Sequence, residues 1–417
     1  MLCYTFSMKM IDQYKGLPRE VYVILIARII SAMGMFVYPF LTLFLSSRVG
    51  FSETKIGMFM LVISLSYIPA AMIGGKLADH FNRKAIYLLA MLLSDAALLA
   101  AGFLSESFSV VYFLILSFFF MNMSMPVLAA MMMDLTSPVN RQESFSLTYL
   151  GINIGGAIGP MIAGLLFENH TAWIFFGEAL LNLIALTMIF LFIKDTKPDE
   201  ADLAAIATDV SRSSEAASNE TLFRVLLRSP LLLSFAACAS VLAFGYSQVS
   251  FMLPLQMEDI FGIGAGARYF GMLFSLNCIV VVIGTPFLVL LTKRNSPIAN
   301  MAVSGILYMF GFGFYAVTEK LSFFALFVVI WTCGEIVSAT NTGVYIANHS
   351  PITHRARFQS IFDIIKGFGH AVGPLMIGYY LINHTIPEAW ILVAILCLFA
   401  SIALYGLYRF ERRHKRR

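Results

Sequence analysis

One acidic side chain in the second half of the chain stands out because its neighbours are apolar. Glu335 lies within Trp331–Val337, in a hydrophobic stretch long enough to cross a membrane. A carboxyl group removed from water binds a proton more readily, because burial disfavours its charged form. Ionisable groups inside a membrane are costly and therefore mark functional positions. We interpret Glu335 as a candidate for coupling to protons or cations, and a structural hydrogen bond to a neighbouring helix is the alternative.

Three more polar side chains lie in the apolar stretch that follows the one containing Glu335. In a helix, all three would lie on the same face. Asp363, Lys366 and His370 are spaced by three and four residues. Asp363 and Lys366 could simply neutralise each other. Histidine changes charge near neutral pH, so His370 could relay protons with Glu335, and a hydrogen bond from its ring to a carbonyl is the equally simple alternative. Glu335, His370 and Asp363 are therefore the candidates for proton coupling.

The elements that must position these residues are twelve apolar stretches. Each has about the 20 residues that cross a hydrocarbon core of ~30 Å. The predicted spans are 21–46, 54–78, 85–104, 109–133, 145–167, 172–193, 230–255, 266–291, 297–318, 321–347, 357–382 and 387–408. The polar stretch 194–229 separates them into two groups of six. We therefore expect an all-α membrane protein with bundles in 1–193 and 230–417, joined by a linker over 194–229.

The composition supports the same class and excludes others. The chain is 59% hydrophobic and 12% charged, with 38 Phe and 23 Met among 417 residues, which a soluble globule does not show. The net charge of +4 is scattered over loops, so we expect no nucleic-acid partner. The five cysteines lack metal-ligand spacing and are expected to be reduced. We expect no metal, no cofactor and no enzymatic activity.

The positions of Lys and Arg predict the orientation of the chain. Most of them fall on one side if both termini are on that side, including the basic tail Arg409–Arg417. Because cytoplasmic loops carry an excess of Lys and Arg, we expect a multi-pass protein of the cell membrane with both termini in the cytoplasm.

The segment between the second and third spans carries a family resemblance. It reads Gly74-Gly75-Lys76-Leu77-Ala78-Asp79-His80-Phe81-Asn82-Arg83-Lys84 and is expected as a loop at the membrane surface. It resembles the motif Gly-x-Leu-Ala-Asp-Arg-x-Gly-Arg-Lys of major facilitator superfamily transporters, and departs from it at His80 and Asn82. The resemblance implies a cytoplasmic gate. Its expected members are Gly75, Asp79, Arg83, Lys84, Asp134 and Arg141.

The family resemblance also bears on three charges in the first half of the chain. Arg28, within the first span, needs an acidic or carbonyl partner, which Asp95 or Glu178 could supply. The family fold places the third and sixth helices at the periphery, so we expect structural roles for Asp95 and Glu178. An anion-binding role for Arg28 stays open. With Lys366, these residues are the predicted intramembrane charges.

Small residues recur in the two halves at a fixed distance. Shifting the chain by 214 residues lays 140–170 over 354–384. The matched glycines and prolines are Gly155 and Gly369, Gly159-Pro160 and Gly373-Pro374, and Gly164 and Gly378. The first set resembles the glycine–proline motif of drug:proton antiporters, and small residues let helices approach closely in lipid. We expect either ordinary close packing or a pliable seam between helices.

These patterns together predict a major facilitator fold, with two six-helix bundles related by pseudo-two-fold symmetry. The expected activity is proton-coupled export of a lipophilic or amphipathic small molecule by alternating access, driven by the proton gradient. The expected partners are the solute, protons and membrane lipids, and the expected state is a monomer. A lipid or glycolipid flippase, a facilitated-diffusion carrier and a non-transporting membrane sensor are the alternatives.

Overall fold

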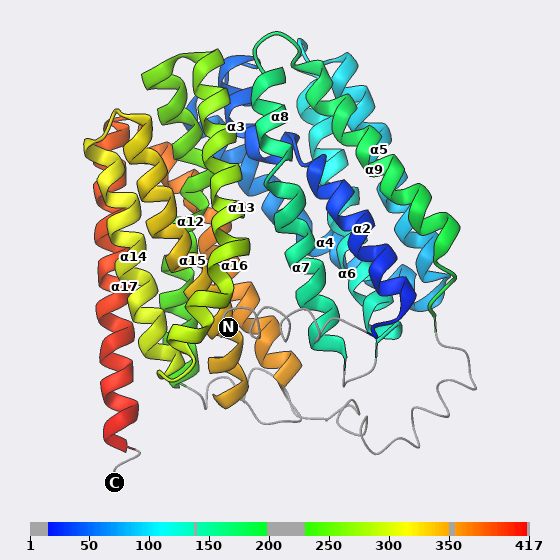
Figure 1. Ribbon diagram of the computed structural model, residues 1–417. Coiled ribbons are helices and arrows are strands. Elements are labelled where there is room, and N and C mark those ends of the chain that lie inside the picture. The colour runs from blue at the N-terminus through cyan, green and yellow to red at the C-terminus, as the bar shows by residue number, and fades with distance from the viewer. Residues whose placement is uncertain (1–15, 137–139, 198–229, 350–354, 415–417) are drawn as a thin grey trace, which may run out of the picture. The chain divides into compact units, whose positions relative to one another are not determined.

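The described part of the chain is built from helices (Figure 1). The computed structural model describes residues 16–136, 140–197, 230–349 and 355–414. Within these residues, 11 helices are long and apolar enough to cross a membrane. The remaining predicted span, 357–382, corresponds to α16 (Arg355–Tyr380), which carries Asp363 and Lys366. The predicted all-α membrane fold is confirmed.

Two compact units divide the chain. The first comprises Met1–Pro39 with Val62–Ser213, and the second comprises Phe40–Leu61 with Ser214–Arg417. The short segment Phe40–Leu61 thus packs with helices that follow it by some two hundred positions in the chain. The two halves 1–193 and 230–417 remain a prediction, and the linker expected over 194–229 lies outside the described residues from 198 onward.

Helix α2 is central to the packing of the first unit. The helices from the first half of the chain are α2 (Arg19–Met33), α3 (Val37–Ser47), α4 (Glu53–His80), α5 (Arg83–Phe103), α6 (Val110–Asp134), α7 (Arg141–Gly156), α8 (Gly159–Leu166) and α9 (Ala172–Phe192). Helix α2 packs on α7 and α9, and α5 packs on α6 and α9.

Helix α12 has the same central position in the second unit. Its other helices are α13 (Ile263–Thr292), α14 (Pro297–Gly313), the short 3-10 helix η2 (Phe314–Val317), α15 (Leu321–His349), α16 and α17 (Ile386–His414), after α12 itself (Pro230–Phe261). Helix α12 contacts α13, α16 and α17, while α15 packs on α13 and α14. This arrangement brings α12, α14, α15 and α16 around the site described below.

Two predicted spans are interrupted in the structure. The first stops at Met33 and resumes at Val37 as α3. The fifth stops at Gly156 and resumes at Gly159 as α8, with Pro160 in the first turn, where a missing N–H costs nothing. Its counterpart Pro374 lies inside the continuous helix α16. The same Gly-Pro pair therefore breaks one helix and not the other.

The eleven-residue loop expected over 74–84 is mostly helical, so that expectation was wrong. Helix α4 continues to His80 and α5 begins at Arg83, which leaves only Phe81 and Asn82 between them. The side chain of Asn82 accepts a hydrogen bond from the backbone N–H of Ala85 at 2.8 Å. Such a cap satisfies an otherwise unpaired N–H in the first turn of a helix, and it explains why so short a connection suffices.

The matched glycines of the two halves lie at close helix contacts. A Cβ atom at Gly155 of α7 would lie 2.4 Å from the carbonyl oxygen of Ile29 in α2. A Cβ atom at Gly369 of α16 would lie 2.0 Å from the carbonyl oxygen of Ser240 in α12. Gly155 of α7 therefore lies too close to the backbone of α2, and Gly369 of α16 too close to the backbone of α12, to be replaced by any residue with a side chain.

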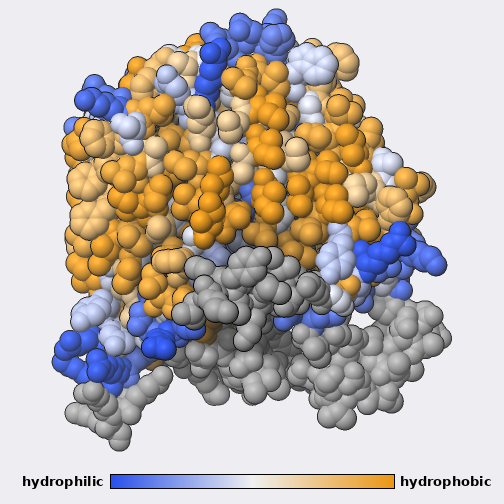
Figure 2. Space-filling view, in the orientation of Figure 1, coloured by the Kyte–Doolittle hydropathy of each residue, from blue (hydrophilic) through white to orange (hydrophobic). Residues whose placement is uncertain are grey.

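Apolar side chains cover the outside of the helices along their length (Figure 2). Large exposed hydrophobic residues follow one another along single helices, as with Leu65, Ile68 and Met72 on α4. Another row on α13 contains Ile283, Phe287 and Leu291. Hydrophilic residues gather at the helix ends in the same view. Surfaces of this kind are stable against lipid chains rather than water.

Candidate functional site

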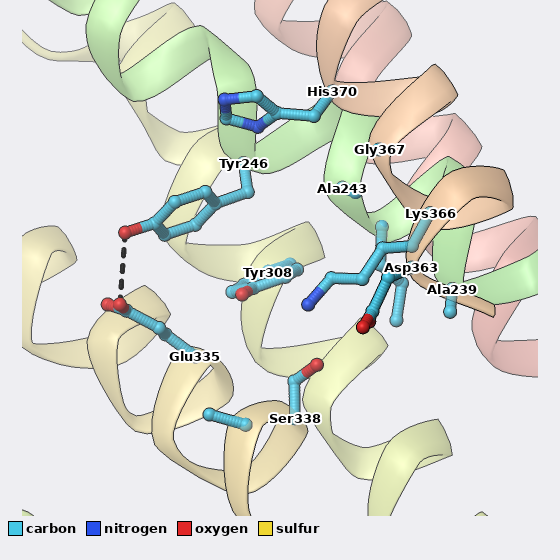
Figure 3. Close-up of a pocket in the computed structure, with 12 residues that line it drawn as sticks. Ala239, Ala243, Tyr246, Tyr308, Glu335, Ser338, Asp363, Lys366, Gly367 and His370 are labelled. Carbon is cyan, nitrogen blue, oxygen red and sulfur yellow. Dashed lines mark hydrogen bonds between the residues drawn. The ribbon is translucent and has the colours of Figure 1, made fainter. Parts of the chain in front are cut away.

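Glu335 is held in place by side chains from two other helices of the second unit. The hydroxyl of Tyr246, on α12, donates to Oε1 of Glu335 at 2.9 Å (Figure 3). The amide Nδ2 of Asn277, on α13, donates to Oε2 at 2.7 Å. Asn277 is itself positioned by a bond of 3.0 Å to Oγ1 of Thr332, one turn before Glu335 on α15. The carboxylate therefore has a fixed orientation.

This carboxylate faces a cavity of about 340 Å³ formed within the second unit. The walls come from α12, α14, α15 and α16, and they combine charged, aromatic and small side chains (Figure 3). Those that matter to the argument are Tyr246, Tyr308, Glu335, Asp363, Lys366 and His370. A pocket with a few convergent polar groups and apolar walls is the usual form of a small-molecule site.

The three predicted side chains of α16 all line this cavity. Lys366 interacts electrostatically with Asp363, one turn before it, and with Glu335 across the cavity. The mutual neutralisation of Asp363 and Lys366 suggested by their spacing stays a prediction. His370 hydrogen-bonds to the backbone of Ala243 and its ring lies 6.3 Å from that of Tyr246. The structure therefore places the three candidates for proton coupling and Lys366 at one cavity, and it gives His370 the backbone contact.

The charges of the first unit form a separate network. The Oγ of Ser31 donates to Oδ1 of Asn182 at 2.7 Å, and Nδ2 of Asn182 donates to Oδ1 of Asp95 at 3.1 Å. Asp95 exposes 4% of its surface. Its Oδ2, like Nε of Arg28, is buried with no hydrogen-bond partner among the described residues. The expected pairing of Arg28 with Asp95 is thus replaced by an amide contact that joins α2, α5 and α9.

Glu178 closes the interruption in the first span. Its Oε2 accepts hydrogen bonds from the backbone N–H groups of Phe36, at 3.1 Å, and Val37, at 2.8 Å. The first N–H groups of a helix have no partner within it, and a carboxylate there also interacts favourably with the helix dipole. Glu178 therefore caps α3, and the pairing with Arg28 that its charge suggested is not what the structure shows.

The predicted gate residues lie near the helix ends of the first unit. Arg83 forms an ion pair with Asp134, which also accepts from Oγ1 of Thr196 at 3.1 Å. The Nζ of Lys84 donates to the carbonyl of Phe190 at 2.7 Å. Gly75 lies within α4. The side chains of Asp79 and Arg141 are outside the described part, so their gate role stays a prediction.

Two cavity residues escaped the sequence reading. Ser338 lies three residues after Glu335, so helical spacing alone could have placed it on the same face. Tyr308 comes from α14 and carries no local signal, because its neighbours are apolar. Conversely Trp331, which is 1% exposed, donates from Nε1 to the hydroxyl of Tyr315 at 2.9 Å and belongs to the core.

The described cysteines are free thiols, as expected: Cys238, Cys278, Cys333 and Cys397. Among the described residues, no group of three or more His, Cys, Asp or Glu side chains is arranged to hold a metal ion. The side chains that line the cavity offer carboxylates, an ammonium group and aromatic rings.

The comparisons with known proteins all find membrane transporters. The family model of the Major Facilitator Superfamily matches residues 24–374. The chain is 26% identical over 312 residues to the MFS-type transporter YqjV of Bacillus subtilis (strain 168), covering 74% of this chain and 73% of that protein. It is 20% identical over 354 residues to a Na(+), Li(+), K(+)/H(+) antiporter of Planococcus maritimus, covering 77% and 80%.

Two further likenesses are more limited. A tetracycline resistance protein, class H, of Pasteurella multocida is 26% identical over 189 residues, which is 45% of this chain and 47% of that protein. The crystal structure of a POT family transporter with a bound peptide conjugate superposes with a TM-score of 0.73, covering 95% of this chain and 97% of that chain. At 13% identity this likeness shows the fold alone.

Proposed function

Because the chain belongs to the Major Facilitator Superfamily, whose members are transporters and not enzymes, we propose that it exports an amphipathic cation in exchange for protons. Glu335 would bind the cation and the proton in turn. The transport would run from the cytoplasm across the cell membrane, with both termini inside. The similarity to the antiporter of Planococcus maritimus supports exchange for protons. The similarity to the tetracycline resistance protein supports export.

The observation that carries the proposal is the state of the Glu335 carboxylate. Both oxygens accept hydrogen bonds, from Tyr246 and from Asn277, which suits an ionised group with a fixed orientation. Each oxygen can accept a further hydrogen bond, and Glu335 lines the cavity. A cation and a proton both satisfy this group, but not at once, and such competition is what antiport requires.

The walls of the cavity fit an amphipathic cation in particular. The rings of Tyr246 and Tyr308 lie 6.3 Å apart at the cavity. Aromatic faces attract cations by about 0.5–2 kcal/mol and also bind apolar surface. Alanine and leucine side chains, including Ala239, Leu242 and Ala243, complete the wall. A strongly hydrated solute would find few polar partners on that side.

Transport by the purified chain in liposomes tests the proposal. Liposomes with an acidic interior and encapsulated DNA should accumulate ethidium in exchange for protons, and the fluorescence of the DNA-bound dye reports its entry. We expect Glu335→Gln, which keeps the shape but not the charge, to lower pH-driven uptake at least tenfold and to remove its pH dependence. The matched control Glu178→Gln changes a carboxylate of the first unit that does not line the cavity. Its pH-driven uptake should stay within about twofold of that of the parent chain, because the charge it loses at the N-terminus of α3 is worth only about 0.3–1 kcal/mol.

Each alternative has a distinct outcome in the same preparation. Ethidium flux that ignores the imposed pH gradient identifies a facilitated-diffusion carrier. Dye binding without flux identifies a sensor, and movement of a fluorescent lipid between leaflets identifies a flippase. Full pH-driven uptake by Glu335→Gln, together with its loss in His370→Asn, moves the coupling role to His370.

A further inference from the structure

The cavity of the second unit contains an unequal number of opposite charges. Two carboxylates, Glu335 and Asp363, face one ammonium group, that of Lys366. His370 is engaged by the backbone of Ala243. With a neutral imidazole, the charged groups at the cavity therefore sum to one negative charge.

Lys366 lies where its charge can offset that of one of the two carboxylates. It lies three residues after Asp363 on α16, where side chains of opposite charge meet on one helix face. Figure 3 shows its side chain extending beside Asp363 into the space that Glu335 and Ser338 face from α15. It interacts with both carboxylates. Asp363 is closer to Lys366 in sequence than Glu335 is, and it lies on the same helix. We therefore assign the charge of Lys366 to Asp363, and Glu335 is then the carboxylate that can bind a charged solute.

This balance restricts the charge of what can bind. Inside a protein, charges interact over short distances with several times their strength in water, and an unpaired charge removed from water is strongly disfavoured. A cavity with one net negative charge is neutralised by one positive charge, whereas a dication leaves an excess of one. We propose that Lys366 sets the charge number of the transported solute to one, and thereby excludes dications. This inference rests on the proposal that the cavity takes amphipathic cations.

An anion-binding role is the competing interpretation of Lys366. An ammonium group could bind the carboxylate of a zwitterionic solute, while Glu335 binds its amino group. Two neighbouring carboxylates already interact with this lysine, so a third anion would have to displace them. The geometry favours the neutralising role, and the two roles predict opposite effects of removing the charge.

Ethidium and propidium make a matched pair for the test. They share one aromatic ring system, but ethidium carries one positive charge and propidium carries two. In the liposome assay, we expect the parent chain to take up ethidium at least tenfold faster than propidium. Lys366→Gln should raise the propidium-to-ethidium ratio at least tenfold, and Lys366→Arg, which keeps the charge, should leave the ratio near that of the parent chain.

A double variant separates charge balance from structural damage. Asp363→Asn combined with Lys366→Gln restores one net negative charge, so the preference for ethidium should return. An unchanged ratio in Lys366→Gln overturns the inference, as does an equal loss of both dyes that the double variant does not repair.

Equilibrium binding distinguishes failure of this inference from failure of the proposed function. Ethidium and propidium binding to the purified chain can be measured by dye fluorescence without any transport. A charge preference in binding that Lys366→Gln reverses, without pH-driven flux, supports the inference and rejects antiport. Flux that depends on pH and on Glu335, without a charge preference that responds to Lys366, does the reverse.

Discussion

Asn182 in the first unit and Asn277 in the second each donate a hydrogen bond to a carboxylate, yet the two carboxylates have different surroundings. Asp95 exposes 4% of its surface, and its second oxygen has no hydrogen-bond partner among the described residues. Glu335 is half-buried, has both oxygens engaged, and faces a cavity. The first contact joins three helices, while the second fixes the orientation of a carboxylate that lines a cavity. The proposed function therefore assigns a structural role to Asp95 and solute binding to Glu335.

The largest effect should follow loss of the amide in the first unit. Asn182→Leu removes the donor to Asp95 and the acceptor for Ser31. Each buried polar group left unsatisfied costs about 1–3 kcal/mol, so we expect the free energy of unfolding in mild detergent to fall by about 2–4 kcal/mol. Asn182→Asp is the matched variant of similar shape. A loss below about 0.5 kcal/mol would show that this network does not hold α2, α5 and α9 together.

The matched change in the second unit should act on transport before stability. Asn277→Leu removes the donor to Oε2 of Glu335, but water can enter the cavity and hydrate the carboxylate. We expect pH-driven ethidium uptake to fall about tenfold, equivalent to ~1.4 kcal/mol, with a smaller loss of unfolding free energy than in Asn182→Leu. The contrast between the two units is contradicted if Asn277→Leu and Asn182→Leu lower the free energy of unfolding equally and Asn277→Leu leaves transport per folded molecule unchanged.

The smallest effect concerns the cap on α3. Glu178→Gln keeps one acceptor oxygen for the N–H groups of Phe36 and Val37 but loses the favourable charge at the helix N-terminus. That charge is worth about 0.3–1 kcal/mol, and we expect the free energy of unfolding to fall by this amount. Glu178→Leu, which also removes the acceptor, should cost more. Equal stability of the two variants would mean that the carboxylate does not act as a cap.

The positions of the membrane helices could be predicted well from the sequence, because a hydrophobic stretch of about 20 residues has one stable arrangement in lipid. The interruptions could not. Gly34 and Pro160 both signal flexibility, but so does Pro374, and α16 continues through it. Whether a helix breaks depends on what satisfies its freed backbone groups, and for α3 that is Glu178, more than one hundred residues away.

Spacing along the chain predicts which residues share a face of one helix, but not which residues of other helices they contact. It therefore predicted only part of the cavity. Asp363, Lys366 and His370 share a helix face, which follows from the helical repeat, and all three line the cavity. The partners of Glu335 come from two other helices, 89 and 58 residues away. Contacts between helices depend on helix rotation and crossing, and a single sequence does not encode these in any local pattern. Arg28 was expected to have an acidic or carbonyl partner, which Asp95 or Glu178 could supply, but Asp95 accepts from Asn182 and Glu178 accepts from the backbone of Phe36 and Val37.

The packing of Phe40–Leu61 has a consequence for biosynthesis. This segment leaves the ribosome early, but its partners on α12 and α16 are made much later. Oγ1 of Thr42, which is fully buried, donates to the carbonyl of Ser250 at 2.7 Å, and Oγ1 of Thr54 donates to the carbonyl of Gly378 at 2.9 Å. Domains generally fold as units in the order of their synthesis. Here the segment Phe40–Leu61 can form these two hydrogen bonds only after α12 and α16 have been made. Helices from the second half of the chain therefore complete the packing of a segment from the first half.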